Sequence, residues 1–165
     1  MKRVIIVHGW EGYPEEGWFP WLKKELEAKK CKVLVPQLPD TENPRIDKWV
    51  SALSDAIGIP DEGTFFVGHS MGCQTIVRYL ETLPEGVKVG GAVFVAGWFN
   101  LENLEGEETA RIAKPWIENP INLEKVKTVL SKSILIISDN APYGAFEENK
   151  AKFAELGSDI VIIPK

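Results

Sequence analysis

The sequence is short of cysteine, of histidine and of long apolar runs. Its two cysteines, Cys31 and Cys73, form neither a Cys-x-x-Cys pair nor a zinc-binding spacing. We interpret both as small buried hydrophobic residues of a protein from a reducing compartment, rather than as a disulfide. The aliphatic run Val4–Val7 near the N-terminus is too short for a signal peptide or a membrane span. We therefore expect a cytoplasmic protein that does not bind membranes.

Basic clusters and nucleotide-binding motifs are missing as well. The 165 residues include 19 Lys and Arg against 24 Asp and Glu, which gives a net charge of −5 at pH 7. No basic run is long enough to follow a phosphate backbone, so we expect no nucleic-acid partner. The sequence also has no phosphate-binding glycine motif and no cluster of His and Asp, so we expect no metal and no cofactor.

The overall composition is that of one globular domain. Apolar residues make up 44% of the chain and charged residues 26%, which is ordinary for a folded protein. A chain of this length buries roughly 70% of its unfolded surface, which is enough for a core without disulfides. We therefore predict a single domain over residues 1–165.

Short runs rich in Val and Ile predict six strands. These runs are nearly continuous in apolar residues, which is typical of parallel strands covered on both faces. The predicted strands are Val4–Val7, Lys32–Val35, Thr64–Val67, Val89–Val95, Ile134–Ile137 and Ile160–Ile163.

Amphipathic segments between the runs predict helices, at Trp18–Lys30, Ile46–Ile57, Thr75–Leu83 and Ala145–Leu156. The alternation predicts an α/β fold with three α/β/α layers around a mostly parallel six-stranded sheet, in the order 2-1-3-4-5-6. Residues 97–121 interrupt the rhythm with an acidic, proline-containing excursion. Such an excursion after a strand either covers a site or forms a solvated surface loop.

The strongest chemical signal is the Gly-x-Ser-x-Gly motif at Gly68-His69-Ser70-Met71-Gly72. It follows a predicted strand and precedes a predicted helix that starts near Cys73, which is the setting of a nucleophile elbow. Glycines are needed on both sides of the serine because larger side chains would collide with the strand and the helix. We therefore predict Ser70 as the nucleophile, and we expect the His69 side chain to point away from the turn and pack.

A second signal is His8-Gly9-Trp10, directly after the first predicted strand. In the predicted strand order this loop lies beside Ser70, at the carboxyl ends of neighbouring strands. The backbone N–H groups of Trp10 and Met71 are the predicted oxyanion hole. His8 is interpreted as a structural residue that braces the loop, rather than as a base.

Several loop residues are expected to line or rim a pocket around the serine. They are His8, Gly9, Trp10, Tyr13, Trp18, Trp98 and Phe99. A pocket lined in this way would favour a small apolar acyl or alkyl group. Taken one by one, aromatic residues more often serve packing than recognition, so packing alone is the alternative for each of them.

The sequence resembles the small α/β-hydrolase-fold serine hydrolases of the retinoblastoma-binding protein 9 and YdeN type. The stretches that carry the resemblance extend over essentially the whole chain. They are Val7-His8-Gly9-Trp10, Trp18-Phe19-Pro20-Trp21-Leu22, Pro36-Gln37-Leu38-Pro39, Gly68-His69-Ser70-Met71-Gly72 and Lys114-Pro115-Trp116. The resemblance implies a six-stranded α/β-hydrolase core and a Ser-Asp-His hydrolase that cleaves small esters or amides through an acyl-enzyme on Ser70.

The chain departs from the family pattern at the catalytic acid and the catalytic histidine. The family's acid usually stands immediately before Pro142, where this chain has Ala141, so Asp139, two residues earlier, is the candidate acid. The alternative is that Asp139 only stabilises a turn or caps a helix. The family's histidine loop follows the sixth strand, and the sequence ends at Pro164-Lys165. We therefore expect the histidine loop and the last helix to be missing and one sheet face to be partly uncovered.

The resemblance together with these departures leaves two possible functions. The chain is a serine hydrolase of small esters or amides, or a catalytically impaired relative that serves as a protein-interaction module. An uncovered apolar face would also favour a homo-oligomer.

Overall fold

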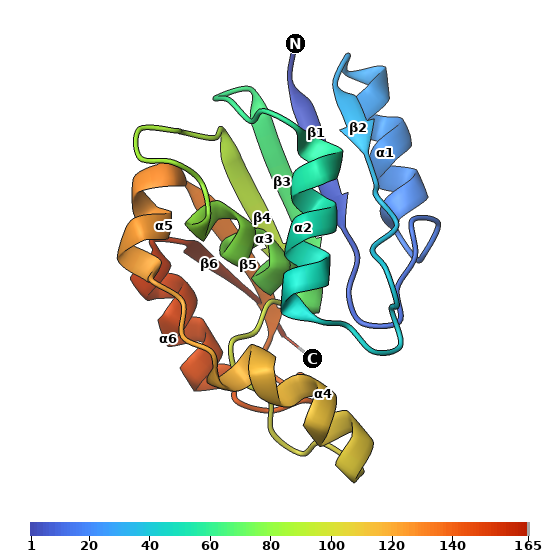
Figure 1. Cartoon of the computed structure of the whole chain (residues 1–165), viewed down its shortest axis with the longest axis vertical. Coiled ribbons are helices and arrows are strands. Elements are labelled where there is room, and N and C mark those ends of the chain that lie inside the picture. Colours follow the sequence, from blue (N-terminus) through green and yellow to red (C-terminus); the bar gives the residue numbers. More distant parts are fainter. Residues whose placement is uncertain (165) are drawn as a thin grey trace.

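Six parallel strands form one sheet in the computed structural model, which describes residues 1–164 (Figure 1). The strand order is β2-β1-β3-β4-β5-β6, and every neighbouring pair is parallel. The strands are β1 (Arg3–Val7), β2 (Lys32–Leu34), β3 (Thr64–His69), β4 (Gly91–Val95), β5 (Ser133–Ser138) and β6 (Asp159–Ile163). This confirms the predicted fold class and strand order.

The third strand is longer than the sequence predicted. Gly68 and His69 still pair with Phe94 and Val95 of β4, so β3 extends up to the residue before Ser70. The backbone therefore passes from strand to helix with a single residue between the two elements.

Six helices connect the strands within the described residues. They are α1 (Phe19–Ala28), α2 (Ile46–Ile57), α3 (Met71–Glu81), α4 (Glu107–Glu118), α5 (Leu123–Val129) and α6 (Phe146–Leu156). Helix α3 begins at Met71, two residues before the predicted start near Cys73. Helix α4 lies within the excursion 97–121, and α5 was not predicted. Side-chain capping by Asn122, which accepts from the Lys125 N–H, starts this seven-residue helix.

Two separate core clusters cover the two faces of the sheet. The larger cluster joins Ile5 and Val7 of β1 to the apolar faces of α2, α3, α5 and α6. The smaller cluster joins Val4, Ile6 and Val33 to Phe19 of α1. Successive residues of a strand point to opposite faces, so α1 packs alone on its side of β1 and β2 among residues 1–164.

The face that carries α1 is uncovered over the second half of the sheet. Ile134, Val161 and Ile163 project from β5 and β6 on this face and are 39%, 46% and 51% exposed. Beside α1 the same face has an apolar hollow of about 520 Å³, lined among others by Phe65 and Val93. The expectation of a partly uncovered sheet face is therefore met in the described chain, and the expectation that the strands are covered on both faces is wrong for this region.

No helix of the described chain has both the length and the apolar character that a membrane span requires.

Candidate active site

Ser70 forms the turn between β3 and α3 by itself. Its φ is 55° and its ψ is −121°, a left-handed conformation that costs a non-glycine residue on the order of 1–3 kcal/mol. Two backbone hydrogen bonds hold it there: the Ser70 N–H donates to Val95 O at 2.9 Å, and the Cys73 N–H donates to Ser70 O at 3.0 Å. Strand β4 on one side and helix α3 on the other therefore hold Ser70 in this strained conformation.

The glycines of the motif allow strand, helix and turn to approach closely. A Cβ at Gly68 would lie 2.9 Å from the Cys73 nitrogen of α3. A Cβ at Gly72 would lie 2.2 Å from the Val7 oxygen at the end of β1. Real Cβ atoms essentially never come within 3.0 Å of another atom. The turn therefore needs glycine at both positions.

The loop after β1 lies directly beside Ser70. A Cβ at Gly9 would be 3.2 Å from Ser70 Cβ and 3.6 Å from the Met71 nitrogen. Met71 is the first residue of α3, so its N–H has no partner within the helix, and the positive end of the helix dipole lies there. Among residues 1–164, neither the Trp10 N–H nor the Met71 N–H donates to a protein acceptor.

A cavity of about 370 Å³ opens at Ser70. Its lining residues come from the loop after β1, from β3 and its turn, from the excursion 97–121 and from the loop after β5. They are Gly9, Trp10, Glu11, Glu16, His69, Ser70, Trp98, Leu101, Leu104, Thr109 and Tyr143. The excursion therefore contributes to the cavity that contains Ser70.

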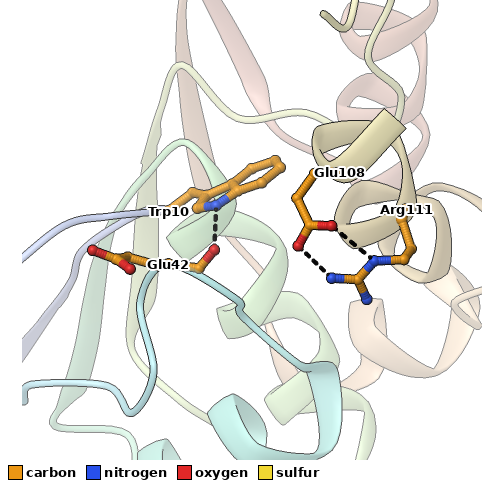
Figure 2. A network of polar contacts seen from close by, with 4 residues as sticks. All are labelled: Trp10, Glu42, Glu108 and Arg111. Atoms are coloured by element: carbon orange, nitrogen blue, oxygen red, sulfur yellow. Dashed lines mark hydrogen bonds and ion pairs between the residues drawn. The ribbon is translucent and has the colours of Figure 1, made fainter. Parts of the chain in front are cut away.

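Helix α4 and the loop after β1 both border the cavity, through Thr109 and Trp10. Figure 2 shows the Trp10 indole, which donates to Glu42 O at 3.4 Å, and the Glu108–Arg111 pair of α4. Arg111 donates to the Glu108 carboxylate, and this hydrogen bond lowers the pKa of Glu108. The pair is exposed, and Arg111 lines a separate pocket between α4 and the start of α2.

Trp98 contacts the candidate nucleophile itself. Its indole N–H donates to Ser70 Oγ at 3.2 Å, and its side chain is buried. Cys73, one turn into α3, is fully buried, and burial raises the pKa of its thiol. Ser70 is therefore the accessible nucleophile of this turn.

Known proteins resemble this chain in sequence and in fold. A family model for serine hydrolases matches residues 4–165. The chain belongs to this serine hydrolase family. YdeN of Bacillus subtilis (strain 168) is 37% identical over 97 residues, which is 59% of this chain and 51% of YdeN. Serine hydrolase RBBP9 of Rattus norvegicus is 27% identical over 151 residues, which is 90% of this chain and 76% of RBBP9.

Solved structures agree with the family assignment. The structure of the B. subtilis ydeN gene product has a TM-score of 0.88 at 26% identity, covering 99% of this chain and 85% of that one. Est1E from Butyrivibrio proteoclasticus, solved with ferulic acid bound, has a TM-score of 0.74 at 15% identity, over 99% and 80% of the two chains. The second likeness shows the α/β-hydrolase fold alone. The sequence match to YdeN spans about half of that protein's length.

His8 of this serine hydrolase family member is a buried residue beneath the loop after β1. Its Nε2 accepts from the Leu38 N–H at 2.9 Å, which leaves Nδ1 as the donor to Gly9 O at 2.9 Å. Burial lowers the pKa of His8 and so favours this neutral tautomer. His8 does not line the cavity, contrary to its place among the expected pocket residues, because both ring nitrogens hold backbone groups.

His69 lies closer to the site than expected. It packs edge-on against Trp18 and Phe19, but it also lines the cavity with Ser70. Burial lowers the pKa of His69, and the nearby charge of Glu16 opposes this shift. Within the described residues, no hydrogen bond joins His69 to Ser70.

The remaining expected pocket residues divide between different surfaces. Trp98 and Gly9 line the cavity at Ser70, whereas Phe99 lines a separate cavity between α4, α5 and α6. Tyr13 is 49% exposed and Trp18 lines the apolar hollow beside α1. The expectation that these three aromatic residues line the pocket at Ser70 is therefore not met.

Asp139 is exposed and does not line the cavity at Ser70. The loop that carries it, with Ala141 and Tyr143, instead borders a second cavity of about 310 Å³. This cavity shares Trp98, Leu101 and Tyr143 with the first one. The described residues therefore leave Asp139 apart from Ser70, and its role as the acid stays a prediction.

Proposed function

We propose that this chain is a hydrolase of small esters or amides with Ser70 as its nucleophile. The observation that carries the proposal is the left-handed backbone of Ser70 at a cavity mouth, between the end of a central strand and a helix N-terminus. Such strain persists only where the surrounding structure enforces it, and it is concentrated at functional sites. Membership of the serine hydrolase family supports a serine as the nucleophile.

The proposed reaction is acyl transfer to Ser70. The Oγ attacks the substrate carbonyl carbon, and the alcohol or amine leaves with a proton to give an acyl-enzyme, which water then hydrolyses. The N–H groups of Trp10 and Met71 would bind the negative oxygen of the intermediate, each contributing about 3 kcal/mol. In the family pattern a histidine takes the serine proton, and Asp139 is our candidate for the carboxylate that orients it.

The cavity favours a small, largely apolar acyl or alkyl group. Its volume of about 370 Å³ lies near the lower end of ligand pockets, which range over roughly 300–1,000 Å³. Trp98, Leu101 and Leu104 supply apolar walls. We also propose that helix α4 and its approach cover this substrate, and that the protein acts in the cytoplasm, since Cys31 and Cys73 are both free thiols.

A fluorophosphonate probe tests the proposal. The wild-type chain should be labelled at Ser70, and Ser70→Ala should abolish labelling without changing the melting temperature by more than a few degrees. Ser54→Ala is the matched control, because Ser54 is an exposed serine of α2 and should leave labelling unchanged. Labelling that persists in Ser70→Ala, or a wild-type chain that resists the probe, would contradict the proposal.

The uncovered sheet face favours a second candidate function. A chain whose uncovered face carries exposed apolar side chains at Ile134, Val161 and Ile163 could act as a non-catalytic module that docks through this face. A second copy of the chain, with the same apolar face, is the partner we propose. Absence of labelling together with self-association would favour this candidate.

A further inference from the structure

Trp98 lies on a loop that hydrogen bonds anchor from two sides. Its backbone oxygen accepts from Gln74 Nε2 at 3.3 Å, and Gln74 Oε1 accepts in turn from the Arg78 side chain at 2.7 Å. On the other side, Asn149 Oδ1 accepts from the backbone N–H groups of the two residues that follow Trp98, at 2.7 and 2.9 Å. Helices α3 and α6 therefore fix the loop after β4 from both sides.

The close packing of the residue before Trp98 adds to this rigidity. A Cβ at Gly97 would lie 2.6 Å from Phe153 Cζ of α6. The residue before it, Ala96, is held at a φ of 53°, which is strained for a non-glycine residue. The backbone from which the Trp98 indole projects is thus held by the fold before any substrate arrives.

The direction of the hydrogen bond between Trp98 and Ser70 is determined by chemistry. An indole nitrogen can donate but cannot accept, so the hydroxyl oxygen of Ser70 is the acceptor at 3.2 Å. The hydroxyl keeps its own proton for transfer to a base. When that proton leaves, negative charge develops on the oxygen that faces the indole N–H, and hydrogen bonds to charged groups are the stronger ones.

We propose that Trp98 is a catalytic residue whose indole N–H holds the Ser70 hydroxyl in one orientation and stabilises the charge that develops on Oγ. This inference rests on the proposed function. The indole keeps its proton throughout. In the reaction with a fluorophosphonate, the Oγ–P bond forms, fluoride leaves with the electrons of the P–F bond, and the serine proton passes to water.

Replacing Trp98 with benzothienylalanine tests the inference, because this residue keeps the shape of the indole and has sulfur in place of the N–H. The rate of Ser70 labelling should fall about tenfold to a hundredfold, as expected for one hydrogen bond to a developing charge. The same replacement at Trp116 is the matched control. Trp116 is also buried, and its N–H donates to Pro44 O at 3.2 Å, away from Ser70.

A nuclear magnetic resonance measurement gives a readout that packing alone would not change. In the ¹H–¹⁵N spectrum, Ser70→Ala should shift the indole N–H resonance of Trp98 and leave that of Trp116 in place. If the wild-type chain is labelled and the Trp98 replacement reacts within about twofold of it, the inference is wrong and the proposed function stands. An unmoved Trp98 resonance would refute the inference as well. If the wild-type chain resists the probe, both fail together.

Discussion

Gly72→Ala should damage the fold at the point where it positions the nucleophile. The new Cβ would lie 2.2 Å from Val7 O and 2.6 Å from His8 O, against ordinary contacts of 3.4 Å and longer. Both oxygens belong to the backbone and cannot rotate away, so we expect an overpacking cost of about 3 kcal/mol or more. The higher helix propensity of alanine returns about 1 kcal/mol. The net loss of stability is therefore about 2 kcal/mol or more.

Denaturation by urea, followed by circular dichroism, measures this loss. For a chain of this size the melting temperature should fall by roughly 4–8 °C. Gly91→Ala is the matched control, because its Cβ would meet its nearest atom, Lys132 O, only at 3.4 Å, and its stability should stay within about 1 kcal/mol of wild type. Labelling of Ser70 should also slow in Gly72→Ala, since the loop after β1 must move. Equal stability of the two variants would refute the reasoning.

Two further predictions concern pH and self-association. Burial lowers the folded-state pKa of His8 and of His69 below 6.5. Below about pH 6.5 the unfolded chain therefore binds more protons than the folded chain. The free energy of unfolding should be at its full value above this pH and fall as the pH drops below it. Denaturation of the wild type and of His69→Gln between about pH 8 and 5 checks this, and a flat profile in both would contradict it. The exposed apolar face should make the chain associate at micromolar concentration, and Val161→Lys should weaken this association. Ile59→Lys should not, because this side chain is 90% exposed and follows α2, which packs on the opposite face of the sheet. A wild-type monomer in sedimentation would rule the face out as a self-association surface.

The sheet could be predicted because its signal is local. Runs such as Ile134–Ile137 consist of residues that favour strands, and their order follows from the rules for parallel crossovers. Helix α5 has only Leu123, Val126 and Val129 on its buried side, which is too short a series for periodicity to show. The start of α3 at Met71 was missed for a different reason. It depends on Gly72 meeting the end of β1, and this is a tertiary contact.

The site could be predicted only where a residue closely follows the end of a strand. Ser70, Gly9, Trp10 and Trp98 each lie one to three residues after a strand end, and all four line the cavity. His69, Leu104 and Tyr143 line the same cavity, but the paths of their loops or their packing partners place them there. No periodicity or motif in the sequence carries that information. The hydrogen bond from Trp98 to Ser70 joins residues 28 positions apart and is likewise a product of the fold.

The described residues place several hydrogen-bond donors around the Ser70 hydroxyl. Trp98 already donates to Oγ, and the free N–H groups of Trp10 and Met71 lie on the loop and the helix that flank it. Of the two histidines in the sequence, His8 has its accepting nitrogen occupied by the Leu38 N–H. His69 lines the cavity beside Ser70 without a hydrogen bond to it among the described residues. We expect labelling that is confined to Ser70, because the donors act on the attacking and the developing oxygens whatever group takes the proton.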